Sequence, residues 1–282
     1  MGKDPINMTR TVFVTGARGK TGREVVAQLA GRGDTEVRGG SSQAPQAPTT
    51  IAFDWRDQST WPKAVGGADA IYLGRPDVQD SPELITQLIA AAPGAHIVLV
   101  SEQGAEQATP GGWVQQVEAA VTGSASRWTI VRPSWFQQVM TDPRYFLDAI
   151  RVHRRLVLST GGTPIAWVDT RDIAAVAVQA ILDPGTHHGK AYTVTGPEAV
   201  TLDGVATALS AVTGAQVTAS DVPLDQAVAG MPPWLSEVVG DMYRRVHDGT
   251  FAAVSGDVEA VTGTRARAIG DFVTEHAAQW RA

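Results

Sequence analysis

Three glycines at regular spacing constrain the fold of this chain more than any other feature of its sequence. Gly16, Gly19 and Gly22 stand at intervals of three residues. A β-forming segment, Thr11–Thr15, precedes them, and a helix-like segment, Thr21–Ala30, begins among them. The first glycine permits a tight turn, the second lets the backbone approach a phosphate, and the third lets the helix pack close to the strand. Since amides at a helix start attract phosphates, the pattern predicts a dinucleotide site. The alternative is a plain glycine-rich turn.

The rest of the first half alternates between short apolar runs and helix-length segments. Expected strands are Glu36–Gly39, Thr50–Phe53, Ala70–Gly74, His96–Ser101 and Trp128–Arg132, and expected helices are Gln58–Val65, Pro82–Ala92 and Gly112–Val121. Alternation of this kind predicts a parallel sheet covered by helices on both faces. His96–Val100 is a continuous apolar run, which is typical of a buried parallel strand.

The second half is less regular. A hairpin is expected around Gly161-Gly162, helices at Thr170–Leu182 and Thr201–Val212, a strand at Ala191–Thr195, and mostly helices after Ser220. We predict an α/β fold: a Rossmann-like doubly wound parallel sheet with a smaller, mostly helical C-terminal substrate lobe. The expected NAD(P)-binding domain spans 8–155, with returning elements from 165–200, and the lobe spans mainly 201–282.

Composition narrows the choice of partners. The formal net charge is −6, and nucleic acid is not expected as a partner because phosphate backbones need clustered cations. The chain has no cysteine, which excludes disulfides and thiolate metal ligands, and no metal is expected. We find no apolar run of the roughly 20 residues that a membrane span needs and no leader, so we expect a cytoplasmic protein. The expected partner is a small-molecule substrate, and the expected oligomeric state is a monomer or a homodimer.

The end of the expected second strand indicates which dinucleotide binds. An NAD site usually has a carboxylate there for the ribose 2′-hydroxyl, and this chain has none between Arg38 and Ser42. Residues that suit a 2′-phosphate are the cations Arg18, Lys20 and Arg38 and the hydroxyl donors Ser41 and Ser42. NADP is therefore favoured and NAD stays possible. The alternative is that these residues are solvated surface groups.

These features resemble the NmrA-like group of atypical short-chain dehydrogenases, and within it the festuclavine-dehydrogenase type of imine reductase. The resemblance covers nearly the whole chain. It includes the glycine turn, Phe53-Asp54-Trp55, Ala70–Pro76, Val117-Glu118, Trp128–Phe136, Trp167–Ala177 and Tyr192–Glu198. Two departures are that relatives often have an arginine near position 42, where this chain has Ser42, and that Glu102 and Gln103 stand where relatives often have small polar residues.

The resemblance implies further cofactor contacts. By position, Asp54 would bond the adenine amino group and Trp55 would flank the ring. The cofactor's ribose would be lined by Gly74, Arg75 and Pro76, and the nicotinamide would lie near Arg132-Pro133-Ser134. Together with the turn residues Gly16, Arg18, Gly19, Lys20, Thr21 and Gly22, these form the expected cofactor site. The alternatives are that Asp54 caps the next helix and that Arg132-Pro133 ends a strand.

The catalytic group is less evident. Ordinary short-chain dehydrogenases use Tyr-x-x-x-Lys, but none of the four tyrosines has a lysine four residues later. Ser101, Glu102 and Gln103 are the catalytic candidates at the end of the fifth strand, and Glu102 could stabilise a cation. Trp135 and Phe136 are candidate substrate walls. The alternatives are a strand-closing serine, a solvated Glu102 and aromatic rings that belong to the core.

Three functions fit these residues. The first is NAD(P)H-dependent hydride transfer to an imine or iminium, an activated alkene or a quinone, in which positioning matters more than a strong acid. The second is a non-redox cyclisation or rearrangement on the same fold. The third, implied by the NmrA resemblance, is an NADP-binding redox sensor that reports to a partner. An enclosed apolar pocket would favour an enzyme and an open cleft with a flat apolar patch would favour a sensor.

Overall fold

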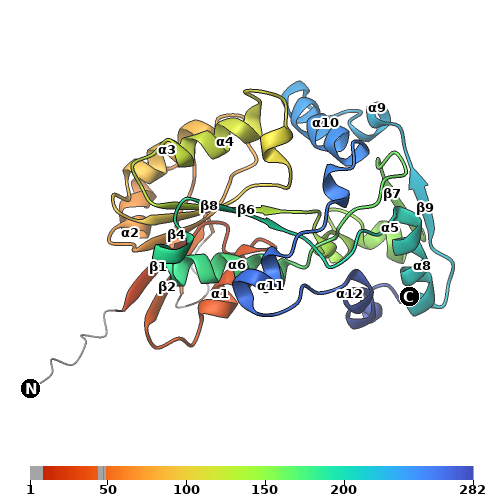
Figure 1. Ribbon diagram of the computed structural model, residues 1–282, viewed down its shortest axis with the longest axis horizontal. Helices are drawn as coiled ribbons and strands as arrows, with labels where there is room; N and C mark the ends of the chain where they lie inside the picture. Colours follow the sequence, from red (N-terminus) through yellow and green to blue (C-terminus); the bar gives the residue numbers. More distant parts are fainter. Residues whose placement is uncertain (1–8, 44–46, 48, 282) are drawn as a thin grey trace, which may run out of the picture. The chain divides into compact units, whose positions relative to one another are not determined.

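A seven-stranded sheet is the largest element of the computed structural model, which describes residues 9–43, 47 and 49–281 (Figure 1). The strands lie in the order β3-β2-β1-β4-β5-β6-β8. Their bounds are β1 Arg10–Val14, β2 Thr35–Ser41, β3 Thr50–Ala52, β4 Ala70–Gly74, β5 His96–Val100, β6 Trp128–Pro133 and β8 Lys190–Val194. Neighbouring strands pair in parallel from β3 to β6. The predicted Rossmann-like parallel sheet is confirmed.

The strand order reverses at a definite point of the sheet, between β1 and β4. β1 pairs with β2 on one side and with β4 on the other. The chain therefore builds one half of the sheet outward through β2 and β3 before it returns to β4. At such a reversal, ligands of this fold class bind outside the carboxyl ends of the strands. The loops that follow β1 and β4 thus frame the expected cofactor position.

Helices fill the connections between strands. Their bounds are α1 Gly22–Leu29, α2 Trp61–Val65, α3 Ser81–Ala90, α4 Trp113–Thr122, α5 Leu147–Arg151, α6 Thr170–Leu182, α7 Pro184–His187, α8 Leu202–Thr213, α9 Leu224–Ala227, α10 Pro233–His247, α11 Asp257–Thr262 and α12 Ile269–Glu275. Short 3₁₀ turns are η1 Gln58–Thr60, η2 Ala105–Gln107, η3 Gln137–Thr141, η4 Thr250–Ala252 and η5 Ala277–Gln279. The strands are held by burial: every residue of β5 is buried, as expected for a strand covered on both faces.

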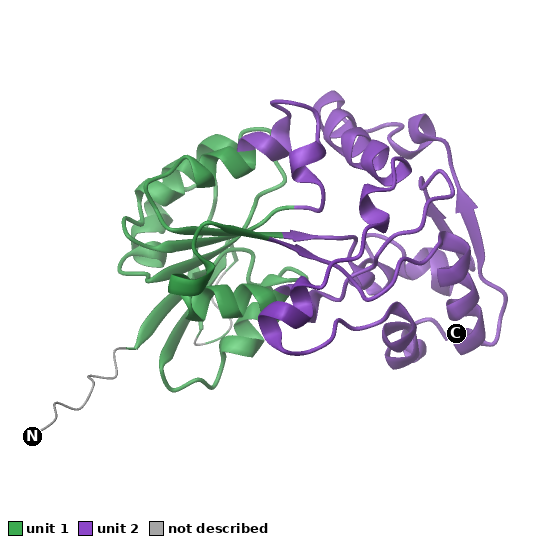
Figure 2. Ribbon diagram, in the orientation of Figure 1, with its two compact units in different colours: residues 1–101, 117–131, 174–191 green, residues 102–116, 132–173, 192–282 purple. Residues whose placement is uncertain are grey.

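The described chain divides into two compact units (Figure 2). Unit 1 contains the residues up to 101 together with 117–131 and 174–191, and unit 2 contains 102–116, 132–173 and 192–282. Unit 1 therefore carries β1 to β5, and in it α1 and α3 lie on opposite faces of the sheet (Figure 1). The domain boundaries expected at 155 and 201 stay a prediction, and Met8, where the first domain was expected to begin, lies outside the described residues.

Unit 2 has its own apolar core. The core includes Trp167 and Trp280, which are almost fully buried, together with residues of α8, α10 and α12. The indole N–H of Trp280 donates to the Met140 carbonyl at 2.9 Å, so the C-terminal turn is fixed to a segment 140 positions earlier. Burial of two indole rings stabilises such a core by several kcal/mol, on the order of 2–3 kcal/mol each. Unit 2 is therefore a packed body and not a loose appendage.

The expected hairpin around Gly161-Gly162 is wrong. The two glycines do form a turn, with φ of +60° and +78°. However, the strand before them, β7 (Arg155–Leu158), pairs in parallel with β9 (Thr218–Asp221) in a separate two-stranded sheet. The Asp221 carboxylate accepts hydrogen bonds from the backbone amides after β7, including that of Thr160 at 2.7 Å. A distant strand, β9, thus takes the place of the expected local partner, and its Asp221 carboxylate accepts hydrogen bonds from the turn after β7. Beyond Ser220 the chain is mostly helical, as expected.

In the described part of the chain, none of the helices combines the length and the apolar character that a membrane crossing requires.

Candidate cofactor and substrate site

The glycine turn between β1 and α1 has the geometry that its spacing predicted. Gly16 has φ +57°, a conformation that side-chain-bearing residues rarely adopt. The Gly19 amide donates to the Gly16 carbonyl at 2.8 Å and closes the turn. A Cβ on Gly19 would lie 3.0 Å from that carbonyl oxygen, and a Cβ on Gly22 would overlap the Gly16 carbonyl. The turn therefore depends on glycine at all three positions.

Thr15 fixes this turn to the neighbouring strand. Its hydroxyl accepts a hydrogen bond from the Gly74 amide at 2.8 Å and donates to the Gly74 carbonyl at 2.9 Å. Thr15 is fully buried, so both hydrogen bonds form away from water. The loops that follow β1 and β4 are thereby held together, and the predicted residues Gly74, Arg75 and Pro76 follow directly. This is the reversal point of the strand order, where a dinucleotide is expected.

Arg75 and Lys20 both have protein partners in this region. The Arg75 guanidinium is mostly buried and its Nε lies 3.9 Å from an Asp77 carboxylate oxygen. Such a separation at an exposed carboxylate contributes little to stability. Arg75 therefore stays close to the end of β4, where it was expected to line the ribose. Lys20 is half-buried within the turn and also interacts with other residues.

The end of β2 differs from the expectation in one respect. β2 extends to Ser41, so Arg38 lies inside the strand and not at its end. The Arg38 guanidinium donates to Glu36 at 2.8 Å and to the Gly66 carbonyl at 2.8 Å. Arg38 is thus held beside the loop after α2 and is not brought to the glycine turn.

Arg18 and the serines after β2 do come together. The exposed Arg18 guanidinium donates to the Gln43 side-chain carbonyl. The Ser41 hydroxyl accepts from the Gln43 amide at 3.1 Å, and Ser42 is exposed beside it. Gly39 lets the two segments approach, because a Cβ there would lie 3.0 Å from the Ala17 side chain. A cation and hydroxyl donors therefore lie near the turn, and no carboxylate ends the strand.

Asp54 and Trp55 follow β3, and the Trp55 ring packs against neighbouring aromatic rings. The Trp55 ring contacts Phe53 at 5.2 Å and Trp61 at 6.1 Å between ring centroids, in edge-to-face arrangements. The Asp54 carboxylate accepts from the Arg56 amide at 2.8 Å. Asp57, and not Asp54, caps the 3₁₀ turn that follows. The alternative that Asp54 caps the next helix is therefore wrong, because Asp57 does so. The side chains of Asp54 and Trp55 are both half-buried, so part of each stays accessible.

Ser101, directly after β5, is buried with an unpaired hydroxyl. Its side chain is 5% exposed, and the hydroxyl oxygen has no hydrogen-bond partner among the described residues. Its backbone amide donates to the Val131 carbonyl at 2.8 Å, which continues the ladder between β5 and β6. A buried hydroxyl without a partner is uncommon in folded proteins. Ser101 therefore both closes the strand and offers a hydrogen bond at the ligand edge of the sheet.

Glu102 is neither solvated nor free. It is buried, and its carboxylate accepts a hydrogen bond from Arg245 of α10. Arg245 also donates to the Gln103 carbonyl at 2.8 Å and to Asp241 at 3.3 Å. Burial raises the pKa of Asp241, but hydrogen bonds from Thr109 and the two neighbouring arginines together hold it below its ordinary value. The solvated alternative for Glu102 is wrong, and unit 2 contains a buried ion network that the sequence did not indicate.

Gln103 is fixed in the same way. Its amide nitrogen donates to the carbonyls of Thr250 at 3.0 Å and Ala253 at 2.9 Å. Its backbone amide donates to the Pro133 carbonyl at 2.8 Å. Gln103 therefore joins the segment after β5, the end of β6 and the turn η4. Its side-chain oxygen is buried without a partner among the described residues.

Trp135 and Phe136, the expected substrate walls, follow the end of β6 and are half-buried against the core of unit 2. The Trp135 ring lies 5.6 Å from the Tyr243 ring, with an angle of 34° between the planes. It also lies 6.1 Å from Phe251. Each ring therefore packs on the core and keeps an accessible part, and the role of the two residues as substrate walls stays a prediction. Tyr243 was missed, because its contact with Trp135 joins residues far apart in the sequence.

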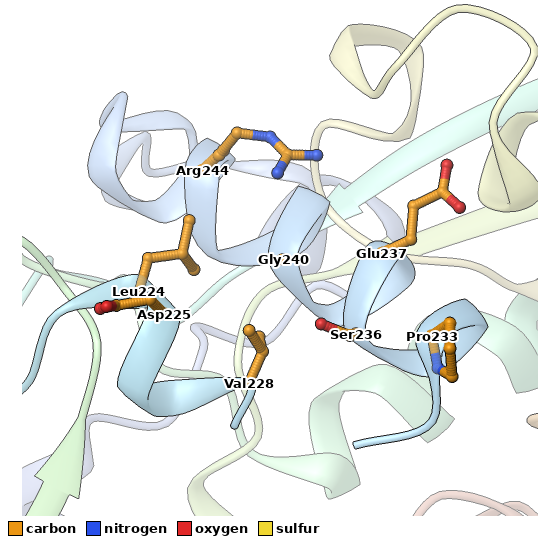
Figure 3. A pocket seen from close by; sticks show the side chains of 8 residues that line it. All are labelled: Leu224, Asp225, Val228, Pro233, Ser236, Glu237, Gly240 and Arg244. Carbon is orange, nitrogen blue, oxygen red and sulfur yellow. The ribbon is translucent and has the colours of Figure 1, made fainter. Parts of the chain in front are cut away.

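A hollow of about 660 Å³ lies elsewhere in unit 2, between α9 and α10 (Figure 3). It is lined by Leu224, Asp225, Val228, Pro233, Ser236, Glu237, Gly240 and Arg244. Charges of both signs stand around it, and it shares no residue with the expected site. We therefore assign it no ligand.

The residues of unit 1 fit a dinucleotide. The glycine turn leaves no room for side chains at Gly19 and Gly22, and the Ser101 hydroxyl is a buried polar atom that lacks a partner among the described residues. Backbone amides at the start of α1 suit phosphates, and exposed Arg18 suits an additional negative group.

Comparison with known proteins agrees with this fit. The sequence model of a family described as NAD(P)H-binding matches residues 16–184. An NAD(P)H azoreductase of Xenophilus azovorans is 34% identical over 96% of this chain and 99% of its own length. The (4-alkanoyl-5-oxo-2,5-dihydrofuran-3-yl)methyl phosphate reductase of Streptomyces griseus is 32% identical, over 94% and 98% respectively. A festuclavine dehydrogenase of Aspergillus fumigatus is 27% identical, over 96% and 99%.

Solved structures share the fold. An NADPH-dependent quinone oxidoreductase of Escherichia coli, solved with NADPH, superposes with a TM-score of 0.77 and 22% identity, over 94% of this chain and 99% of that one. NmrA, a negative transcriptional regulator, superposes with a TM-score of 0.73 and 16% identity, over 95% of each chain. The festuclavine and NmrA similarities are those that the sequence resemblance predicted.

Proposed function

This chain belongs to the NAD(P)H-binding family and is an NAD(P)H-dependent reductase, and from this premise we propose that it transfers hydride from NADPH to a small organic acceptor with a polarised double bond. The acceptor classes are an imine or iminium, an activated alkene or a quinone. An azo compound is added because the 34% identical relative is named an azoreductase. The observation that carries the proposal is the cradle formed by the glycine turn and locked to the end of β4 by Thr15.

The preference for NADPH follows from charge. A carboxylate at the end of β2 would repel a 2′-phosphate, and β2 instead ends at Ser41, with Ser42 directly after it. Arg18 lies near this end through its hydrogen bond to Gln43. A guanidinium can donate two hydrogen bonds to one phosphate. Such a pair would strengthen the binding of NADPH, which carries the 2′-phosphate, relative to NADH, which lacks it. Because Arg38 is held by Glu36 and Gly66, we assign the 2′-phosphate to Arg18 and the two serines.

The residues after β5 and β6 would orient the reacting groups. Bound NADPH supplies the hydride. Ser101 offers an unpaired hydroxyl, and we propose that it donates to the nicotinamide amide or to the acceptor. Since Glu102 is paired with Arg245, we propose that Glu102 and Gln103 are positioning residues, which hold the segment that follows Ser101. Pro133 would contact the nicotinamide, and Trp135 and Phe136 would provide apolar contact for the acceptor.

Two measurements test the proposal. Titration with NADPH and with NADH, followed by fluorescence transfer from tryptophan and by calorimetry, should show binding that is tighter for NADPH. NADPH oxidation, followed by absorbance, should then occur with at least one member of a panel of cyclic imines, N-alkyl iminium salts, enones, quinones and azo dyes. Tight binding without oxidation by any acceptor would favour a non-redox enzyme or a redox sensor. The absence of binding would contradict all three functions.

A further inference from the structure

Reduction of a neutral acceptor needs a proton, and Tyr243 is the tyrosine whose surroundings suit a donor. When hydride adds to one end of a neutral double bond, the other end gains negative charge and must be protonated. The structure describes all four tyrosines of the chain. Tyr72 is fully buried within β4. Tyr145 is 54% exposed. Tyr192 lies on β8 and already interacts with another residue.

The position of Tyr243 is defined by its contact with Trp135. Trp135 is the second residue beyond the end of β6, so it stands at the carboxyl edge where acceptors of this fold class bind. The Tyr243 ring packs on the Trp135 ring at 5.6 Å between centroids. Both residues belong to unit 2, so their contact does not depend on how the units are arranged. The phenol is therefore carried by α10 to the surface expected to hold the acceptor.

The Tyr243 hydroxyl is available for a ligand. It makes no hydrogen bond within the described part of the chain, although its ring is half-buried. Burial raises the pKa of Tyr243 to about 12. The phenol consequently keeps its proton throughout the neutral range and can act as a hydrogen-bond donor. None of the residues of unit 2 is a lysine, so the unit itself supplies no ammonium group of the kind that lowers the tyrosine pKa in the usual dyad.

We propose that Tyr243 is a catalytic residue, whose hydroxyl donates a hydrogen bond and then a proton to the oxygen or nitrogen atom of a neutral acceptor that gains negative charge. The proposal rests on the proposed function. In the step, the π bond of the acceptor breaks and a new bond to hydrogen forms with the electron pair of the hydride. The phenol O–H proton passes to the atom left with negative charge, and the phenolate takes a proton from water. The acceptor is reduced by two electrons and NADPH is oxidised.

Comparing a neutral acceptor with an iminium acceptor distinguishes a proton-donating role of Tyr243 from a purely structural one. Hydride addition to an N-alkyl iminium cation gives a neutral amine directly, so no proton is required. The Tyr243→Phe variant keeps the ring that packs on Trp135 and removes only the hydroxyl. For a neutral enone, quinone or azo acceptor we expect kcat to fall about 100-fold, the lower range for loss of a general acid, with little change in KM. For the iminium acceptor we expect kcat within about twofold of the unchanged protein, because that step needs no proton.

Controls and solvent isotope effects complete the test. Tyr145→Phe removes an exposed hydroxyl of the same unit and should leave both acceptors unaffected. The solvent deuterium isotope effect on kcat for the neutral acceptor should be present in the unchanged protein and altered in Tyr243→Phe. Equal loss with both acceptors would show that the variant disturbs packing and would overturn the proposal, as would no loss with either.

The same assays distinguish failure of the proposed reductase function from failure of the proposed role of Tyr243. If the unchanged protein oxidises NADPH with neither acceptor class, the reductase assignment to these acceptors fails and the role of Tyr243 fails with it. If the unchanged protein reduces the iminium and no neutral acceptor, the proposed function stands and the role of Tyr243 is overturned, because no proton-requiring step exists.

Discussion

The glycine turn of unit 1 and the ion network of unit 2 achieve rigidity by opposite means. The turn spans seven residues, Gly16 to Gly22, and depends on absent side chains and on backbone hydrogen bonds between near neighbours. The network joins Glu102 to Arg245, which are 143 positions apart, through charged side chains almost without solvent contact. The first device presents open backbone to a ligand, whereas the second satisfies its charges internally. The comparison indicates that the glycine turn of unit 1 serves to bind a ligand and that the ion network of unit 2 serves to fix distant segments of the chain to one another.

The two devices also differ in their sensitivity to substitution. A buried ion pair contributes modestly to stability while intact, but loss of one partner leaves an uncompensated charge. A glycine turn tolerates nothing larger than hydrogen at its close contacts, yet its loss is local. Substitutions in the ion network should therefore mainly affect folding, and substitutions in the turn should mainly affect cofactor affinity.

Arg245→Met should have the largest effect, because it removes the cation that pairs with the buried Glu102 carboxylate and the partly buried Asp241 carboxylate. Glu102 and Asp241 would be left without it, and we expect a loss of about 3–5 kcal/mol in the free energy of unfolding. Denaturant-induced unfolding followed by tryptophan fluorescence measures this loss. Arg244→Met is the matched control, since Arg244 is 52% exposed and lies 3.4 Å from Asp241. That variant should lose less than about 1 kcal/mol. Similar losses in both variants would remove the distinction between the two regions.

A pH-dependent effect tests whether unit 1 also contains a long-range buried pair. His96 at the start of β5 is fully buried, and its Nε2 lies 2.9 Å from the Thr129 hydroxyl. Burial, with the positive neighbours Arg127, His188 and His187, lowers the pKa of His96 from 6.5 to about 4. Between these pH values the unfolded chain binds the proton and the folded chain does not. Stability from this group is therefore complete above pH 6.5 and decreases as the pH falls toward 4, by about 3 kcal/mol.

The measurement for His96 is the free energy of unfolding at several pH values across this window. His96→Gln should reduce the slope of stability against pH, because the substituted side chain does not titrate. His153→Gln, at an exposed histidine, should leave the slope unchanged. If His96→Gln retains the full slope, the buried histidine is not its source, and unit 1 contains no long-range titrating pair of this kind at β5.

The contrast between local and distant contacts also explains what could be predicted from the sequence. The glycine turn and the apolar run of β5 are contiguous signals, so the sheet was predicted correctly, whereas the cofactor position stays a prediction. The pairing of β7 with β9 joins segments about 60 positions apart, and this region was predicted wrongly as a hairpin. Glu102 and Tyr243 were misjudged or missed for the same reason, since their partners lie on another element. Arg38 was placed at a strand end because a β-strand boundary has no sharp sequence signal.

Gly22→Ala should separate cofactor binding from folding. A Cβ at this position would overlap the Gly16 carbonyl, so the turn must open. We expect the Kd for NADPH to rise about 30-fold, which corresponds to about 2 kcal/mol, the middle of the range for an overpacked site. Calorimetric titration measures the change. Gly33→Ala is the control, because nothing lies within 4 Å of a Cβ at that position and its backbone is not left-handed. An equal loss of NADPH affinity in both variants would show that the turn has no special role.

Arg18→Ala should have the smallest effect, and it should depend on the cofactor. If Arg18 contacts the 2′-phosphate, its removal should raise the Kd for NADPH about tenfold, equivalent to about 1.4 kcal/mol, and should leave the Kd for NADH nearly unchanged. Arg23→Ala is the matched control, because Arg23 is an exposed arginine on α1 that pairs with Glu24 at 3.2 Å, and it should change neither affinity. Added salt should reduce the difference between native protein and Arg18→Ala, since an exposed ion pair is screened. Equal weakening of NADPH and NADH would instead assign Arg18 to the shared pyrophosphate, and the open edge of unit 1 would then bind both dinucleotides without selecting between them.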